Sequence, residues 1–451
     1  MKRVLLLTLA VLAFLPALST AHDGGVDVMR GHGQIADLTL GTPLPMPVTP
    51  PENVSYVTGD NGFTGGHVVT QGDRLYLGSY GRGLHIYDIS TPEAPRRIGA
   101  YTPGLRADAP PDAIDVGDRR FAVLNGTRRT HSSLPPEGRT DRTEWLDVTD
   151  ASAPKVLHTF GPDQVDGESH NGDIVDSRQL YVPSGGVGAQ GLRIYDIAPT
   201  VTTPASECRN GDPANPCKPQ IVFRGNPGEL WAQSPHRGTK PVGAPFTHTH
   251  DVEIYPGYRV RGMGRRDIML LAEGGNYTGT GDTGSMFVID ITDPANPVVI
   301  NRWLHAQGSG HHPIRYHHEA QFLASDPRVV LVTDEDMHNG CGTAGGVTAV
   351  RLSPDLKSSR ELSEWFIPAG TPAPVCSVHV FSSQGSRVFL GSYNAGLQVV
   401  DYSNPAEPRQ AGEYIAEGTT AWGALAHRGV VYVGDMTRGL DVYRYEGGQT
   451  P

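Results

Sequence analysis

The sequence carries little charge. Only 19% of its 451 residues are charged, and 48 Asp and Glu residues against 37 Lys and Arg residues give a formal net charge of -11. A low charged fraction excludes a self-repelling, disordered polymer and requires a buried core. The negative balance disfavours nucleic acid and anionic membrane surfaces as partners, because the electrostatic contribution to binding would be repulsive. We therefore expect no nucleic-acid partner.

Several catalytic signatures are also absent. The chain contains no Gly-x-Ser-x-Gly elbow, no P-loop, no His-Glu-x-x-His sequence and no dinucleotide-binding fingerprint. Its four cysteines show no Cys-x-x-Cys spacing, which disfavours thioredoxin-like chemistry and zinc ribbons. These absences exclude the enzyme classes that are recognised by these particular motifs.

The cysteines instead indicate two disulfide bonds. Cys208 and Cys217 bracket a short segment rich in turn-forming residues. Such a pair in an oxidising compartment is most simply a disulfide that closes a loop. Cys341 and Cys376 would then pair by elimination.

Long hydrophobic runs are confined to the N-terminus. Lys2 and Arg3 precede an apolar stretch, residues 4–18, which small residues follow. This order is typical of a secretory signal peptide, which we expect to span residues 1–21 and to be cleaved before His22, an uncleaved anchor being the alternative. No later run reaches the roughly 20 apolar residues of a membrane-spanning helix. The mature protein is therefore expected to be secreted, periplasmic or at the cell surface, without an integral membrane segment.

Glycine and proline are abundant, and one unit recurs along the chain. Each unit is a short alternating strand, a turn made by Asp, Ser or Thr and Pro, and a second strand; copies occupy residues 83–101, 145–154, 287–297 and 397–408, with partial copies at 192–197 and 440–443. The Asp can bond neighbouring N–H groups, while the prolines end the strand. Another strand pair precedes each copy, so the unit has four strands. Four-stranded units every ~40–50 residues are typical of a β-propeller.

This repeat resembles that of the LVIVD-repeat family of secreted bacterial β-propellers. The likeness lies in a Gly-Leu-x-Ile-x-Asp-Ile strand, as in Gly83–Ile89, and an Asn/Asp-Pro-x-x-Pro turn, as in Asp293–Pro297, and it covers nearly the whole mature chain. It implies an all-β fold, a single propeller. The family is defined by its repeat, so the resemblance implies no particular activity.

Counting innermost strands gives about seven blades. They start near His67, Asp112, His170, His250, His318, His379 and Trp422. The last blade stops short of a fourth strand, and an N-terminal strand within residues 35–57 is expected to complete it, which removes two exposed edges. The predicted domain map is a signal peptide (1–21), a flexible lead (22–48), the propeller (49–446) and a C-terminal tail (447–451).

Histidine recurs at one location of the repeat, the start of the innermost strand. The five residues are His67, His170, His250, His318 and His379. Innermost strands line the central channel, so these imidazoles can converge at its mouth. Imidazole is a common ligand of transition metals, and we predict a site for Cu, Fe, Zn or Mn. The alternative is that these histidines bond only backbone groups and water.

Acidic residues accompany the histidines. Asp251 and Glu319 directly follow two of them, and Asp112 takes the histidine position in another blade, so we predict that these carboxylates form a second shell that orients the rings. The acidic segment Thr333–Gly340 has the oxygen-rich composition of a hard-cation site, but a solvated turn is the favoured interpretation.

Three functions remain open. One is a metal-dependent enzyme, an oxidoreductase or a hydrolase, that uses the channel-mouth ion. Another is a metal carrier that uses the same histidines without turnover. The third, which belongs to a different functional class, is a non-catalytic extracellular or cell-surface scaffold whose rim loops bind a small molecule or a protein.

Overall fold

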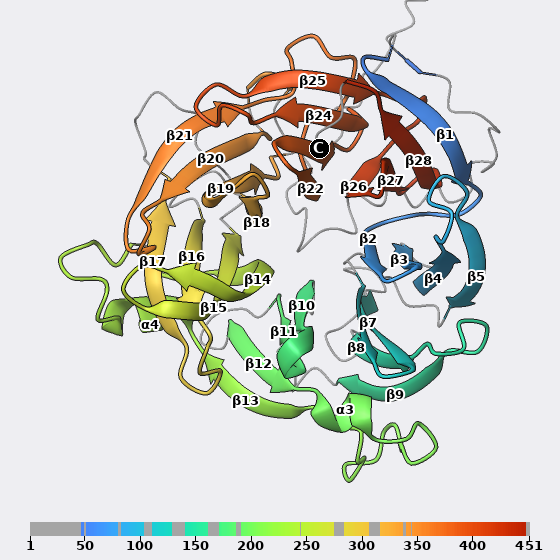
Figure 1. Ribbon diagram of the computed structural model, residues 1–451, viewed down its shortest axis with the longest axis vertical. Coiled ribbons are helices and arrows are strands. Elements are labelled where there is room, and N and C mark those ends of the chain that lie inside the picture. Colours follow the sequence, from blue (N-terminus) through green and yellow to red (C-terminus); the bar gives the residue numbers. More distant parts are fainter. Residues whose placement is uncertain are drawn as a thin grey trace, which may run out of the picture.

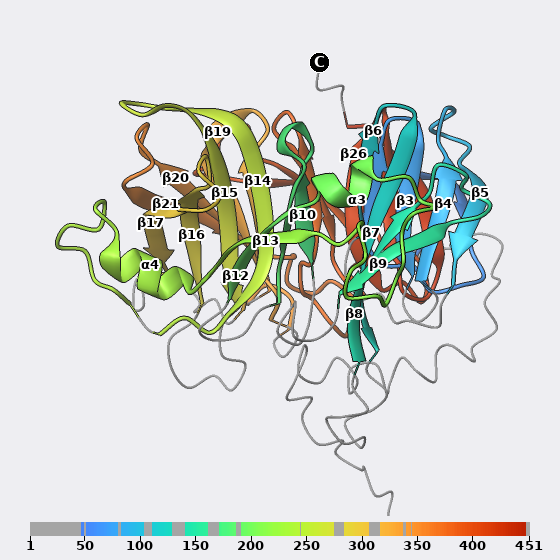
Figure 2. The ribbon, with the colours of Figure 1, turned by 90° about the horizontal axis from the view of Figure 1, so that it is seen from below.

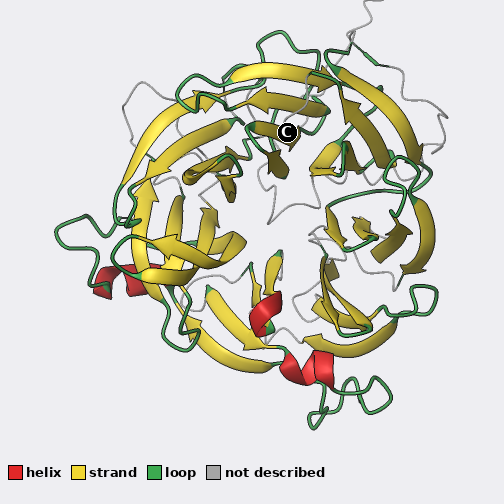
Figure 3. Cartoon of the chain, in the orientation of Figure 1, coloured by secondary structure: helices red, strands yellow, loops and turns green. Residues whose placement is uncertain are grey.

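Seven antiparallel sheets are arranged as blades around a central axis (Figures 1 and 3). The innermost strands run roughly along that axis (Figure 2). The computed structural model describes residues 47–48, 51–79, 83–102, 111–128, 140–160, 171–185, 191–243, 245–274, 284–305, 316–336, 340–343 and 345–447. The predicted all-β propeller of seven four-stranded blades is confirmed.

Blades 1 to 4 each use four consecutive strands, innermost first. Blade 1 contains β2 (Val68–Gln71), β3 (Arg74–Ser79), β4 (Gly83–Asp88) and β5 (Arg96–Tyr101). Blade 2 contains β6 (Asp112–Val116), β7 (Arg119–Arg128), β8 (Thr140–Asp147) and β9 (Lys155–Phe160). Blade 3 contains β10 (Gly172–Val175), β11 (Leu180–Pro183), β12 (Leu192–Asp196) and β13 (Gln220–Gly225). Blade 4 contains β14 (His248–Val260), β15 (Gly264–Gly274), β16 (Ser285–Asp290) and β17 (Val298–Leu304).

The remaining blades complete the ring. Blade 5 contains β18 (His317–Leu323), β19 (Asp326–Asp334), β20 (Val347–Leu352) and β21 (Ser359–Trp365). Blade 6 contains β22 (Phe381–Gln384), β23 (Arg387–Gly391), β24 (Leu397–Asp401) and β25 (Arg409–Tyr414). Blade 7 contains β26 (Ala421–His427), β27 (Val430–Asp435) and β28 (Gly439–Tyr445), with β1 (Val54–Asp60) as its outer strand.

The closing strand comes from the N-terminal side, as predicted. β1 pairs antiparallel with β28, with Val54 opposite Tyr445 and Asp60 opposite Leu440. Strand β1 begins within the predicted window, residues 35–57, and extends three residues beyond its end. This pairing closes the ring, because β28 now has a partner strand on each side, β27 and β1.

The repeated Asp shapes the turn after the third strand. Its carboxylate accepts the backbone N–H two residues further on, at 2.8–3.0 Å, in five blades: Asp88, Asp147, Asp196, Asp290 and Asp401. The N–H of Ser90 is the main reason why the pKa of Asp88 is lowered to about 2. This bonding of Asp to its own turn is the predicted chemistry of the repeat.

The hydrophobic core lies between neighbouring blades. Between blades 4 and 5, for example, Leu270 and Val288 pack in one buried cluster with Phe322 and Val350. Fully burying one such side chain contributes about 1.5–3 kcal/mol. Each blade therefore depends on its neighbours for a core.

Both predicted disulfides are present, Cys208–Cys217 and Cys341–Cys376. Two connections between strands contain short helices, α3 (Ala198–Thr202) after β12 and α4 (Pro227–Gln233) after β13. In the described part of the chain, no helix is both long enough and apolar enough to cross a bilayer.

Candidate metal centre

Four of the five predicted histidines lie together at the start of the inner strands. The ring centroids of His250 and His318 are 4.3 Å apart, those of His318 and His379 are 3.9 Å apart, and those of His379 and His67 are 5.1 Å apart. All four residues are buried. The fifth, His170, lies outside the described residues.

An aromatic residue replaces histidine in blade 7. The Trp422 indole lies 4.0 Å from the His379 ring and 5.9 Å from the His67 ring, measured between centroids. Trp422 therefore packs against two members of the imidazole cluster and contributes an apolar wall instead of a ligand.

β-Bulges aim the clustered side chains. The register between β14 and β15 shifts at His250, and that between β26 and β27 shifts at Trp422. The register between β18 and β19 shifts across His318 and Glu319. A bulge breaks the strict alternation of side chains along a strand. A histidine and the acid that follows it can therefore both face the interior of the ring, where regular strands would turn one of them away.

Hydrogen bonds to the next blade fix two of the rings. His250 Nδ1 lies 2.8 Å from the carbonyl oxygen of His318, and His379 Nδ1 lies 2.9 Å from that of Trp422. A carbonyl oxygen only accepts, so Nδ1 carries the proton and donates it in both bonds. The lone pair of each neutral ring is then on Nε2. Histidines that bind metals are commonly held in this way.

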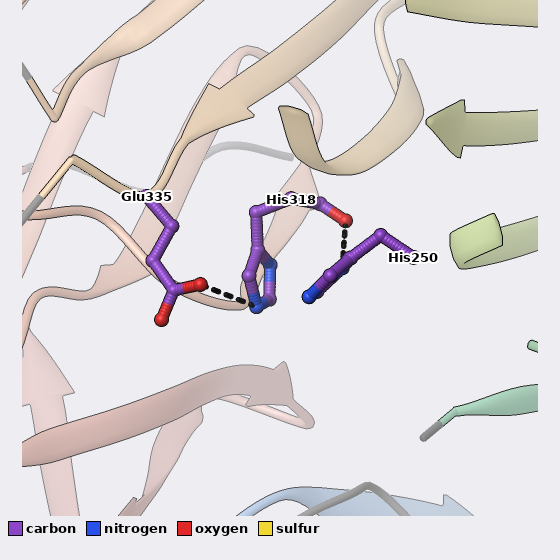
Figure 4. A group of neighbouring side chains, drawn as sticks. All are labelled: His250, His318 and Glu335. Atoms are coloured by element: carbon purple, nitrogen blue, oxygen red, sulfur yellow. Dashed lines mark hydrogen bonds and ion pairs between the residues drawn. The ribbon is translucent and has the colours of Figure 1, made fainter. Parts of the chain in front are cut away.

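A carboxylate joins the cluster. Glu335, directly after β19, is buried, with Oε2 3.9 Å from His318 Nε2 and Oε1 3.6 Å from His379 Nε2. The Tyr393 hydroxyl donates a hydrogen bond to Oε1. Burial, and then the proximity of Glu335, raises the pKa of Tyr393 well above its usual range, so the hydroxyl keeps its proton. Figure 4 shows the His318 ring between the Glu335 carboxylate and the His250 ring.

The sequence interpretation missed Glu335, because Thr333–Gly340 was expected to be a solvated turn. That expectation is wrong for the described part, in which Thr333, Asp334, Glu335 and Asp336 are buried. Asp334 pairs with His317 and the Glu335 N–H bonds the Tyr316 carbonyl, so Glu335 lies at the end of β18 that carries the histidines. The sequence did contain a signal for Glu335. This acid directly follows the second strand of a blade whose first strand carries histidine.

The geometry approaches that of a metal site. Ligand atoms of His250, His318 and Glu335 all lie within 4.8 Å of one another. Ligands on one ion at about 2.1 Å are roughly 3–4 Å apart, so small side-chain movements would bring these atoms into coordination distance. The donors are imidazole and carboxylate, which suit zinc, iron, manganese and copper(II), whereas a thiolate ligand is not available from cysteines held in disulfides.

A cavity of about 300 Å³ lies in the channel next to the cluster. His67 lines it, and so do five acids: Asp112, Asp173, Asp251, Glu253 and Glu319. Several acids bond the inner strand of the following blade. Asp112 accepts the Ile174 N–H at 2.7 Å, and Glu319 accepts the Phe381 N–H at 3.0 Å.

The predicted second shell lines this cavity. The described hydrogen bonds of Asp112 and Asp251 go to backbone N–H groups. The ring N–H groups of His250 and His379 have backbone carbonyls as acceptors instead. An orienting role of Asp112, Asp251 and Glu319 toward the imidazoles stays a prediction.

Burial changes the protonation of the cavity acids. It raises the pKa of Asp112 and of Asp251 to about 7, because the charged form loses its hydration. The pKa values of Asp173, Glu253 and Glu319 are raised well above their usual range, chiefly by burial and further by neighbouring carboxylates. The cavity is therefore polar but carries less negative charge at neutral pH than its acids suggest.

Comparison with known families supports the repeat assignment. Residues 267–304, in blade 4, and residues 384–416, in blade 6, match the LVIVD repeat. Two blades of the chain therefore contain LVIVD repeats. No curated protein matches its sequence significantly.

Solved structures share the fold of this LVIVD-repeat propeller. One is the periplasmic gluconolactonase PpgL of Pseudomonas aeruginosa, with a TM-score of 0.54 and 12% identity over 83% of this chain and 93% of that one. Another is the β-propeller domain of Cps50 (Swd1) from Myceliophteria thermophila, with a TM-score of 0.51 and 12% identity over 85% of this chain and 98% of that domain. Identities this low establish the architecture alone.

Proposed function

We propose that this LVIVD-repeat propeller binds one divalent transition-metal ion at the mouth of its channel. His250, His318 and Glu335 supply the ligands, and His379 and His67 lie beside them. The observation that carries the proposal is the convergence of buried imidazole and carboxylate ligand atoms within 4.8 Å. The Nδ1 bonds of His250 and His379 add support, because they leave Nε2 as the donor atom.

The cavity supports a reactive role for this ion. Two imidazoles and one carboxylate leave coordination positions for water or a substrate. His67 belongs both to the imidazole cluster and to the cavity wall, so a small molecule in the cavity would lie beside the metal ligands. The acidic wall favours neutral, polar or cationic molecules over anions.

The reaction class follows from the identity of the ion. Iron, copper or manganese would supply redox chemistry, and zinc would supply a Lewis acid that activates water. We therefore propose a metal-dependent oxidoreductase or hydrolase. In a metal carrier the coordination would be closed by further protein ligands, of which His379 and His67 are the nearest.

Elemental analysis tests the proposal. Untagged protein exported into an oxidising compartment is measured by plasma mass spectrometry, beside H250A/H318A and the control H427A. His427 is at the opposite end of the inner strand β26 and outside the cluster. We expect H250A/H318A to contain one equivalent of metal less than the wild type and H427A. Electron paramagnetic resonance then identifies iron, copper or manganese.

Either of two results would overturn the metal proposal. One is a wild-type protein that neither contains a transition metal nor takes one up on titration. The other is equal metal content in H250A/H318A and the wild type. A chain without metal would leave the extracellular scaffold, with a small molecule or protein bound at the rim, as the function to pursue.

We also propose that the protein is exported. The two disulfides fit an oxidising compartment. The predicted signal peptide lies outside the described residues and remains a prediction. Sequencing the N-terminus of the mature protein, with His22 expected first, tests it.

A further inference from the structure

A second group of potential ligands lies between the outer strands of blades 4 and 5. His305 directly follows β17, and Glu361 and Glu364 are in β21. His305 Nδ1 is 3.4 Å from Glu361 Oε2, and His305 Nε2 is 3.7 Å from Glu364 Oε1. The three side chains are only 1%, 15% and 8% exposed. This outer-strand cluster shares no residue with the channel mouth.

A β-bulge brings the two carboxylates to one face. Residues three apart on a regular strand point to opposite sides. In β21, however, Glu361 lies opposite Val350 and Glu364 lies opposite Thr348, because the register shifts by one residue at Leu362. Val350 and Thr348 share a face of β20, and Val350 packs into the core that blades 4 and 5 share. Both glutamates therefore face blade 4, where His305 lies.

The same bulge occurs in other blades without this pair of acids. The residues at the two equivalent positions are Arg97 and Ala100, Val156 and Thr159, Ile221 and Arg224, Val299 and Arg302, and Gln410 and Glu413. In β1 the equivalent residues are Tyr56 and Gly59. Among the seven outer strands, all of which carry the bulge, only β21 places two carboxylates there. The cluster is thus a local departure from the repeat, and the repeat does not require it for folding.

The donor set suits a divalent cation. A divalent ion placed among the three side chains would be attracted by both carboxylates and would use the His305 imidazole as a third ligand. Ligand atoms of all three residues lie within 4.8 Å of one another.

We propose that His305, Glu361 and Glu364 form a second metal site, which binds zinc or a similar divalent ion and joins blade 4 to blade 5. Imidazole and carboxylate oxygen are both regular zinc ligands, at about 2.0–2.2 Å. The Trp303 indole packs edge-on against the His305 ring, with centroids 5.8 Å apart, and shields one side of the site. Its location indicates a structural role, because it lies on outer strands and away from the channel. It does not depend on the channel-mouth metal.

Zinc binding in the H250A/H318A background tests this site alone. The protein is loaded with zinc, dialysed and analysed by plasma mass spectrometry. We expect about one zinc per chain, retained after adding E413Q and lost after adding E361Q/E364Q. Glu413 occupies the position in blade 6 that Glu364 occupies in blade 5, so E413Q controls for removal of an outer-strand carboxylate. In the otherwise unchanged chain, E361Q/E364Q should lower the zinc content by one equivalent.

A second measurement protects the test against a variant that fails to fold. Cobalt(II) added to the H250A/H318A protein should give visible absorption bands that zinc then abolishes. Absence of both zinc binding and cobalt bands in this background would overturn the proposal, and so would full zinc retention in the E361Q/E364Q variant. Failure of the channel-mouth proposal would leave these outcomes unchanged, because that site is already removed.

Discussion

The channel mouth and the channel cavity are built from the same inner strands but with opposite chemistry. At the mouth, His250 and His379 donate hydrogen bonds to carbonyl groups of the following blade. In the cavity, Asp112 and Asp173 accept hydrogen bonds from N–H groups of the following blade. Both regions therefore use side chains to connect neighbouring inner strands.

The difference lies in what remains after those bonds form. At the mouth, Nε2 lone pairs converge beside Glu335, and a cation would stabilise the group. In the cavity, acids with raised pKa values gather, and protons stabilise them. The two regions should therefore respond oppositely to acid, which removes metal from imidazole at the mouth and relieves repulsion in the cavity.

Removing the mouth histidines should have the largest effect. A ligand present at about 1,000 times its dissociation constant stabilises the native state by about 4 kcal/mol. We expect EDTA to lower the thermal midpoint of the wild type by several degrees more than that of H250A/H318A, because only the wild type has the mouth metal to lose. Calorimetry with and without EDTA measures this difference. H427A should behave as the wild type, and an equal EDTA shift in H250A/H318A would contradict the comparison.

Removing each disulfide in turn should distinguish the channel mouth from the periphery of the propeller. Cys341 and Cys376 flank the segments that carry Glu335 and His379, and the Val378 N–H bonds the Gly345 carbonyl between them at 2.9 Å. We expect C341S/C376S to lower the free energy of unfolding by about 4 kcal/mol, given its sequence separation of 35, and to weaken metal binding.

The matched control is the disulfide at the edge of blade 3. The Cys208–Cys217 bond closes a shorter loop, with a separation of 9. Its removal in C208S/C217S should lower the free energy of unfolding by about 3 kcal/mol and leave the metal affinity unchanged. Urea unfolding and metal titration of both variants give the two readouts. Equal metal affinity in the two variants would show that the Cys341–Cys376 bond does not support the mouth.

Removing one hydroxyl should weaken metal binding without loss of fold. Tyr393 holds the Glu335 carboxylate, so Y393F should lower metal affinity by about tenfold, as is typical when a hydrogen bond to a metal ligand is lost. Isothermal titration measures it. Y402F is the control, because the buried Tyr402 hydroxyl of the same blade makes no hydrogen bond to the described residues. A tenfold loss in both variants would indicate a general effect of removing a hydroxyl.

The fold could be predicted because its determinants are local and repeated. The Asp turns, the proline-ended strands and the missing fourth strand of blade 7 each have a sequence signal, and the structure shows all three. The histidine cluster followed from the same logic, since equivalent positions of a repeat lie at equivalent places around the axis.

The parts that were missed depend on register and bulges. Glu335 joins the mouth because Asp334 pairs with His317, a non-local fact that composition does not reveal. Glu361 and Glu364 share a face only because of the bulge at Leu362. Glu253 reaches the cavity from the strand that carries His250 and Asp251, where its alternation with Asp251 was a signal that could have been used.

The smallest expected effect is the pH dependence of the cavity. Burial raises the pKa of Asp112 to about 7, above the value of about 3.9 for an unfolded chain. Between about pH 4 and pH 7 the folded state then holds more protons than the unfolded state. The stability that Asp112 contributes is therefore fully present below pH 4 and is lost as pH rises through 7. For this one group, raising pH from 6 to 8 should lower the free energy of unfolding by on the order of 1 kcal/mol.

A difference between variants isolates that contribution. His317, whose pKa burial lowers to about 3, acts in the opposite direction but equally in every variant. D112N removes the titrating carboxyl, so between pH 6 and 8 in EDTA its stability should fall by about 1 kcal/mol less than that of the wild type. D118N, at an exposed position in the same blade, should follow the wild type. Parallel urea-unfolding profiles for D112N and D118N would show that the cavity does not retain protons, and the contrast between mouth and cavity would then rest on the metal alone.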